Sequence, residues 1–373
     1  MTVNRKRFYC VIPGLAAVLS IAACSSQVHW KGTVVEDGDV TVVKNPKEPL
    51  YITPILELRE ELSLGGPDAE GDYAFVQIRG VAVDNDGTIY VLDRRDAHIR
   101  VFDASGQYVR TIGRKGQGPG ELDGPLSLSI IRAKGELASL ETRRMSFFKT
   151  DGTFLRHVSF KEIWALVGRV DGAGDIHVIE PILDPANPRA ELKKLGPDAA
   201  HSTTLAEFPM PGPEKFDPFL PVGRFTFDRD NNLVYGYPAT YEIRFFGAES
   251  GKVFRKILRD YDPVAVTDEE KEERSKGLMP ETPLVFSKYH SAYIHFFTSD
   301  EGHLFVQTWE KTKDGTYLHD IFDAEGRFMA RIPLRPTGIE ILNGKYYAFE
   351  TDDEGYQFVK RYAVTWTVKP DVP

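Results

Sequence analysis

The stretch from Gly80 to Leu122 constrains the fold of this chain more than any other. It contains four short runs of alternating apolar residues, and each run ends in a turn or loop signal. Two of the separators, residues 84–87 and 103–106, are Asp/Gly turns, which between period-two hydrophobic runs are strong hairpin signals. Four antiparallel strands within about 35–45 residues are typical of one blade of a β-propeller. The stretch therefore predicts an all-β fold built from repeats of this unit.

The same unit recurs along the chain. We predict complete blades at residues 76–113, 125–160, 222–258 and 292–334. A further blade begins near Ile163, and its last two strands are not assigned within residues 190–208. The sixth unit, residues 338–364, lacks a fourth strand, which residues 56–64 can supply from the N-terminal side. The sequence thus predicts a six-bladed β-propeller of four-stranded antiparallel blades, closed by an N-terminal strand that completes the last blade.

Two segments interrupt the repeat, and we predict insertions near residues 181–221 and 260–291. The first is rich in proline. The second contains Thr267-Asp268-Glu269-Glu270, a capping-box pattern that predicts the start of a short charged helix. With these insertions the predicted propeller spans residues 50–368.

Residues 1–23 have the features of a lipoprotein signal peptide. A positive segment precedes the apolar run Phe8–Ser20, and Leu19–Cys24 resembles a lipobox, in which small residues precede a cysteine that becomes diacylated. We expect Cys24 to carry the lipid and residues 24–49 to form a tether. An ordinary signal peptide with a chance cysteine is the alternative. Ser25 and Ser26 replace the aspartate that retains lipoproteins at the inner membrane in enteric-type bacteria, so we expect an exported protein anchored at the outer membrane.

Charge and cysteine content exclude several classes of protein. The formal net charge is −9, and removal of Arg5, Lys6 and Arg7 with the signal leaves about −12. Nucleic-acid binding needs clustered cations, so no nucleic-acid partner is expected. Cys10 lies in the signal, and the mature chain therefore has neither a disulfide nor a thiolate metal site.

Several stretches are close to a known pattern. Residues 83–91, 101–106 and 113–121 resemble the bacterial six-bladed β-propeller lipoproteins with NHL-like repeats, and residues 321–326 and 343–347 are similar to the last two blades of that family. The resemblance covers about residues 40–364 and is weakest at residues 181–221. It implies the fold and an exported binding or scaffold role. Fold alone does not determine function.

Blade topology sorts the loops onto two faces of the ring. If the first strand of each blade is innermost, the tight turns after the first and third strands share one face, which we call the turn face. The loops between second and third strands and the links between blades share the other, which we call the loop-rich face. Because function concentrates on loops held by a rigid scaffold, we predict that the loop-rich face is the binding surface.

Four arginines are expected to cluster on this face. They are Arg94, Arg95, Arg143 and Arg144, in corresponding loops of neighbouring blades. Guanidinium groups bind carboxylates and phosphates in a bidentate manner, so the cluster predicts an anion site. The alternative is ion pairing with nearby acidic residues, namely Asp93, Asp96 and Glu141.

Two aromatic residues are further candidates for binding. Tyr237 and Trp309 lie in loops of the same face and could stack on a sugar ring. The alternative is packing between blades.

No pattern for catalysis or for a bound metal is recognisable. HExxH, H-x-H and G-x-S-x-G are absent, and the glycine run of residues 113–120 lacks the ending of a phosphate loop. The innermost strands are mostly apolar, with Glu340 as an exception. We therefore predict no catalytic residue, metal or cofactor.

The expected function is a non-catalytic binding or scaffold module for an envelope protein, a glycan or another anionic ligand. A metal-dependent enzyme similar to propeller lactonases or lyases is the alternative.

Overall fold

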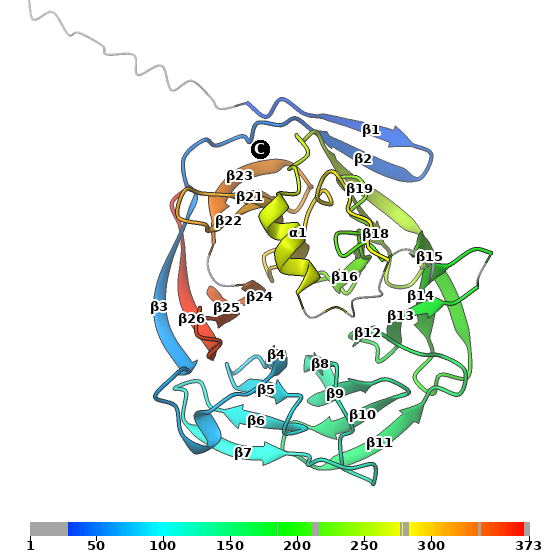
Figure 1. The fold of residues 1–373 in the computed structure, drawn as a ribbon, viewed down its shortest axis with the longest axis vertical. Coiled ribbons are helices and arrows are strands. Elements are labelled where there is room, and N and C mark those ends of the chain that lie inside the picture. The colour runs from blue at the N-terminus through cyan, green and yellow to red at the C-terminus, as the bar shows by residue number, and fades with distance from the viewer. Residues whose placement is uncertain are drawn as a thin grey trace, which may run out of the picture.

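The computed structural model describes residues 29–184, 186–210, 216–276, 278, 283–334 and 337–368. Six β-sheets are arranged around a central axis, as Figure 1 shows in a view down that axis. Cys24 and the predicted signal peptide lie outside the described residues. Within them, no helix is both long and apolar enough to cross a bilayer.

Each blade has four antiparallel strands, and its first strand is innermost. In chain order the blades are formed as follows: blade one by β4 (Ile78–Val83), β5 (Ile89–Asp93), β6 (His98–Phe102) and β7 (Tyr108–Ile112); blade two by β8 (Ser127–Ile131), β9 (Glu136–Glu141), β10 (Arg144–Lys149) and β11 (Phe154–Ser159); blade three by β12 (Val167–Val170), β13 (Ile176–Ile182), β14 (Arg189–Leu195) and β15 (Ser202–Pro209). Blade four contains β16 (Arg224–Phe227), β17 (Leu233–Gly236), β18 (Glu242–Phe246) and β19 (Val253–Arg259); blade five contains β20 (His295–Thr298), β21 (Leu304–Lys311), β22 (Tyr317–Phe322) and β23 (Phe328–Pro333); blade six contains β24 (Thr337–Leu342), β25 (Lys345–Thr351), β26 (Gln357–Trp366) and β3 (Leu56–Gly65).

Strand β5 shows why the inner strands are apolar on both sides. All five of its residues are buried. Ile89 and Val91 pack in a core shared with blade six, whereas Tyr90 and Leu92 pack in a core shared with blade two. Successive side chains of a strand point to opposite faces of the sheet, so each blade contributes to two cores. The predicted six-bladed architecture is confirmed.

Strand β3 closes the ring as predicted. It pairs antiparallel with β26, from Leu56 opposite Trp366 to Gly65 opposite Phe358. The N-terminal strand therefore completes the blade formed by the C-terminal end of the chain, and the two segments lie side by side in Figure 1.

The structure corrects the predicted tether of residues 24–49 for the part that it describes, residues 29–49. Strands β1 (Thr33–Asp37) and β2 (Val40–Asn45) form a hairpin, and β2 pairs parallel with β19, so that the sheet of blade four has six strands. Asn45 is buried and fixes the hairpin to blade five, because its side-chain amide donates to the Gly326 carbonyl at 2.9 Å and accepts from the Phe328 amide at 2.7 Å. A tether would need none of these contacts.

The two predicted insertions differ in outcome. Much of residues 181–221 belongs to regular strands of blade three, β14 and β15, so the insertion there is smaller than expected. In the second insertion, helix α1 (Asp268–Ser275) forms with the predicted capping box, in which the Glu270 amide donates to the Thr267 hydroxyl at 3.2 Å. Two short 3₁₀ helices, η1 (Gly71–Tyr73) and η2 (Arg132–Lys134), complete the described elements.

Candidate functional site

The loop-rich face carries most of the exposed large apolar side chains. Nine lie in loops between second and third strands or in links between blades: Val76, Trp164, Leu166, Leu183, Phe216, Val222, Val285, Tyr289 and Tyr356. Within the described residues, none of the exposed large apolar side chains lies in a tight turn of the turn face. Exposed apolar groups gathered on one side of a protein are typical of interaction surfaces.

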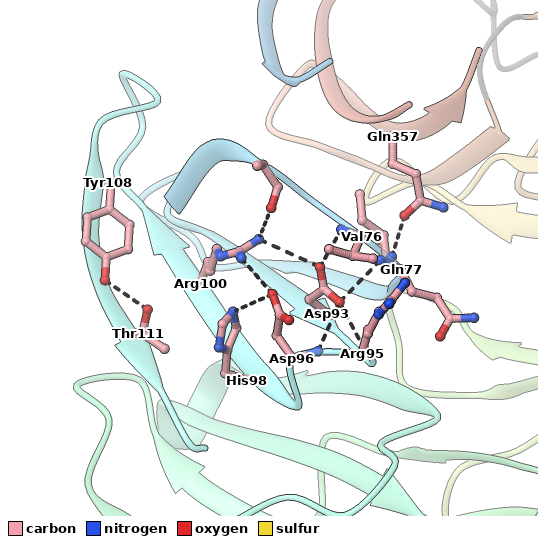
Figure 2. Close-up of polar contacts among 12 residues, drawn as sticks. Val76, Gln77, Asp93, Arg95, Asp96, His98, Arg100, Tyr108, Thr111 and Gln357 are labelled. Carbon is pink, nitrogen blue, oxygen red and sulfur yellow. Dashed lines mark hydrogen bonds and ion pairs between the residues drawn. The ribbon is translucent and has the colours of Figure 1, made fainter. Parts of the chain in front are cut away.

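Asp93 organises the arginine loop of blade one (Figure 2). This aspartate is fully buried, and its carboxylate accepts hydrogen bonds from the backbone amides of Val76 at 2.7 Å, Gln77 at 3.2 Å and Arg95 at 3.0 Å. Arg100 lies beside it, with Nη1 3.7 Å from the carboxylate. The aspartate thus holds the end of β5 against the link from blade six, which is a structural role.

The acidic residues of this loop are paired with Arg100 and not with Arg94 or Arg95. Arg100 also donates to the Asp96 carboxylate at 3.0 Å and to the Ala74 carbonyl at 2.8 Å. In the described part of the chain, the side chains of Arg94 and Arg95 have neither an ion pair nor a hydrogen bond. Arg95 is exposed and Arg94 is half-buried.

Arg143 and Arg144 are neighbours with opposite roles. Arg144 donates to Glu141 at 2.8 Å and to the carbonyls of Gln117 at 2.8 Å and Glu121 at 3.1 Å, so it fixes the glycine-rich exit of blade one. Ion pairing, the alternative stated from the sequence, therefore describes Arg144. Arg143 is exposed, and no side-chain partner exists for it among the described residues.

The two aromatic candidates are engaged in packing. Tyr237 stacks on Phe208 of blade three, with ring centroids 5.2 Å apart, and burial raises the pKa of its hydroxyl. Trp309 stacks on His290, with centroids 4.0 Å apart, and donates to the Ser291 hydroxyl at 3.1 Å. One face of each ring is therefore occupied, which favours the packing interpretation.

The central channel differs from the sequence prediction. A cavity of about 400 Å³ lies between the six innermost strands and reaches the turns at their ends. Its wall contains Arg132 and Arg169 in addition to Glu340, and Glu340 is paired with Arg132. Burial raises the pKa of Glu340, although the charge of Arg132 acts in the opposite direction. The expectation of a mostly apolar channel with a lone glutamate is therefore wrong.

A sequence signal for these arginines existed. Arg169 in β12 and Arg224 in β16 are charged residues within short strands assigned to the innermost position, where both sides are normally covered. Arg132 follows β8 directly and could be placed only once the turn was known. The channel thus presents guanidinium groups, which cannot bind a cation. Within the described ranges, no three His, Cys, Asp or Glu side chains come together in a way that could hold a metal ion.

A larger hollow of about 740 Å³ lies at the rim of the ring. It is formed where residues 31–33 and 44–47 of the hairpin region meet residues 240–241 and 258–261 of blade four. It adjoins the first described residues and is remote from the arginines of the loop-rich face.

Comparison with known proteins supports the architecture. Residues 69–158, which contain blade one and nearly all of blade two, match a family model, DUF5128, described as a 6-bladed β-propeller. The structure is similar to that of a Bacteroides fragilis protein described as exported, with a TM-score of 0.55, 14% identity, and coverage of 88% of this chain and 100% of that chain. It is also similar to a member of the DUF4221 family from Bacteroides vulgatus, with a TM-score of 0.52, 10% identity, and coverage of 84% and 99%. At these identities the likeness shows the fold alone. No curated protein matches the chain.

Proposed function

We propose that this chain is an exported, lipid-anchored binding module of the cell envelope that acts through its loop-rich face and does not catalyse a reaction. A closed ring of six sheets is a rigid scaffold, because neighbouring blades pack on one another through shared hydrophobic cores. Such a scaffold can present loops in fixed positions, which suits binding. The exported description of a similar Bacteroides fragilis protein agrees with this location.

One observation carries the proposal. Arg94, Arg95 and Arg143 lie in corresponding loops of adjacent blades, and none has a side-chain partner in the described chain, although the protein as a whole is acidic. The carboxylates around them are already used, by Arg100 and by Arg144. A guanidinium group without an internal partner can form bidentate hydrogen bonds with a carboxylate or phosphate of a ligand.

We propose an anionic ligand for this face, and an acidic glycan is the first class to test. Exposed apolar residues such as Trp164 and Tyr289 extend the same face over blades three and four. They could contact the apolar side of a sugar chain or of an envelope protein that carries acidic groups.

A glycan array probed with the full chain tests this function. We expect binding to acidic glycans and loss of most of it in the double variant Arg94→Ala/Arg143→Ala. The control is Lys149→Ala/Lys252→Ala, which removes the same charge from exposed positions at turns of the turn face. Equal loss in both double variants would mean that net charge alone governs binding, and this would contradict a site on the loop-rich face.

The proposed lipid anchor has a separate test. Cys24→Ala should prevent lipidation and leave the signal uncleaved, which metabolic labelling with palmitate and the mass of the chain both detect. Membrane fractionation then distinguishes the inner from the outer membrane. Unchanged processing and unchanged palmitate labelling would contradict lipidation at Cys24.

A further inference from the structure

The cavity inside the ring is a site separate from the loop-rich face. Its wall is formed by innermost strands and by residues at their ends on the turn face, including Ala133, Gly172 and Asn231. It therefore opens on the side opposite to the proposed binding loops. Its volume of about 400 Å³ falls within the range of roughly 300–1,000 Å³ that is usual for small-molecule sites.

The cavity wall contains three arginines and three acidic residues: Arg132, Arg169, Arg229, Asp228, Asp300 and Glu340. Each of the three acids has a hydrogen-bond partner, although Oδ1 of Asp300 is buried without one. Glu340 pairs with Arg132. The Asp228 carboxylate accepts from the backbone and side chain of Asn232 at 2.8 and 3.0 Å, and Asp300 accepts from the Asn343 amide at 2.7 Å.

Arg169 is the one member of this set without a partner among the described residues. Arg132 pairs with Glu340, and Arg229 donates to the Glu301 carbonyl at 2.8 Å. Arg169 makes neither a hydrogen bond nor an ion pair there, yet the ring surrounds it. Burial lowers the pKa of its guanidinium, and the charge of Glu340 acts in the opposite direction.

A second arginine increases the positive charge along the channel. Arg224 begins β16 of the adjacent blade, and its only hydrogen bond in the described chain runs from Nε to the Ile294 carbonyl at 3.2 Å. His295, which begins β20, lies near both arginines. Burial, the neighbouring His319, and the charges of Arg224 and Arg169 lower the pKa of His295 to about 3. This histidine is therefore neutral at physiological pH, and the arginines supply the charge.

The Arg169 side chain is exposed to the cavity, and its guanidinium group has neither a hydrogen-bond acceptor nor an ion-pair partner among the described residues. The described contact of Glu340 is with Arg132 and not with Arg169. The side chain of Arg169 is open to the cavity, so its acceptors can come from solution. We propose that the cavity binds a small organic anion, and that Arg169 binds the carboxylate or phosphate group of that ligand.

Isothermal titration of the full chain in detergent, at low ionic strength, tests this site. The probes are sodium glucuronate, inorganic phosphate and, as an uncharged control of similar size, glucose. We expect saturable binding of at least one anion and none of glucose. Tighter binding of glucuronate would identify a sugar carboxylate as the preferred chemistry, and tighter binding of phosphate would identify a phosphate group. Absence of binding by both anions would overturn the proposal.

Variants expected to weaken anion binding, together with one expected to strengthen it, make the test specific. Arg169→Gln should weaken anion binding by about tenfold or more, because a charged hydrogen bond is lost. Arg169→Lys should retain part of it, which excludes a simple loss of folding. Glu340→Gln should tighten binding, because Arg132 also becomes available. Arg274→Gln, at an exposed position of α1, is the matched control and should bind as the wild type does. Wild-type affinity in Arg169→Gln would contradict the site.

The proposal for the cavity and the proposal for the loop-rich face can be disproved independently of each other. Arg94→Ala/Arg143→Ala should leave titration with the small anions unchanged, and Arg169→Gln should leave the glycan array unchanged. Loss of small-anion binding in the Arg94→Ala/Arg143→Ala variant would place the anion on the loop-rich face and overturn the cavity site.

Discussion

The two faces of the ring differ in how they use their polar side chains. On the turn face, aspartate carboxylates accept the backbone amides of their own turns; this holds for Asp84, Asp103, Asp171, Asp228 and Asp323. On the loop-rich face, Arg94, Arg95 and Arg143 have no side-chain partner in the described chain, and apolar side chains are exposed. The tight turns thus use their own carboxylates, whereas the loops of the opposite face retain groups that can bind another molecule.

The comparison also shows that the loop-rich face has a fixed base. Its unpaired arginines lie close to Asp93 and Glu141 in the sequence, and both of these acids are buried and hydrogen-bonded. We therefore expect that the unpaired arginines can be replaced without loss of the fold, whereas replacement of the buried acids beside them destabilises it. The predictions below test this distinction, from the largest expected effect to the smallest.

Asp93→Ala should have the largest effect on stability. It removes the acceptor for four backbone amides and the buried partner of Arg100. Removal of one partner of a buried charged pair costs about 3–5 kcal/mol. Urea unfolding monitored by fluorescence measures the change in the free energy of unfolding. A change below about 1 kcal/mol would show that this loop is not held by Asp93.

The variant Asp171→Asn tests whether an ionised carboxylate stabilises a turn of the turn face, through the pH dependence of the free energy of unfolding. Burial alone would raise the pKa of Asp171, but the hydrogen bond from His177 at 3.0 Å, the charge of His177 and the backbone amide of Asp175 together lower it. The ionised carboxylate is therefore favoured in the folded state. Its contribution is complete above the pKa of the unfolded chain, about 4, and is lost as the pH falls through the lower folded value.

We expect Asp171→Asn to reduce the free energy of unfolding by about 1–3 kcal/mol at pH 7 and by much less at pH 2–3. Asp86→Asn, at an exposed position of another turn, is the control and should change little at either pH. A difference that stays constant with pH would contradict the role given to the Asp171 carboxylate.

Arg144→Ala should have a moderate effect that is confined to one loop. The change removes the ion pair with Glu141 and the hydrogen bonds to the carbonyls of Gln117 and Glu121. We expect a loss of about 1–2 kcal/mol and faster proteolysis within residues 113–122, because that loop loses its fixed contacts. Limited proteolysis with mass spectrometry locates the cuts. Cleavage elsewhere with residues 113–122 still protected would contradict this assignment.

Arg143→Ala should have the smallest effect on stability, within about 0.5 kcal/mol, because the side chain is exposed and has no partner in the described chain. The same variant should weaken binding of an acidic glycan. These two adjacent arginines thus have separable effects. Arg144 contributes to the stability of the fold, and Arg143 contributes to ligand binding. A stability loss in Arg143→Ala equal to that of Arg144→Ala would remove the distinction.

The fold was largely predictable because its signals are local. Asp/Gly turns between alternating runs define hairpins wherever they occur, and the strand lacking at the C-terminal end matched an unpaired strand at the N-terminal end. The β1–β2 hairpin was not predicted to join blade four, since β2 pairs with residues more than two hundred positions away and the sequence does not indicate that partner. Strands β14 and β15 were left unassigned although their partners lie close to them in the sequence.

The candidate site was predictable only at the level of loops. The loop-rich face followed from topology, but the difference between Arg143 and Arg144 depends on which carbonyls and carboxylates lie nearby after folding. Arg169 and Arg224 were overlooked in the channel because the apolar residues around them dominate the pattern of the inner strands. A charged residue in a strand covered on both sides was the available signal.

Hydrogen–deuterium exchange with and without the strongest acidic glycan from the array tests the central claim most directly. The account predicts added protection in residues 93–97 and 141–144 of the loop-rich face, and none in the turn-face residues 84–88 and 132–135. Protection of the turn-face residues with the loops unchanged would contradict the claim that this protein binds through its loop-rich face.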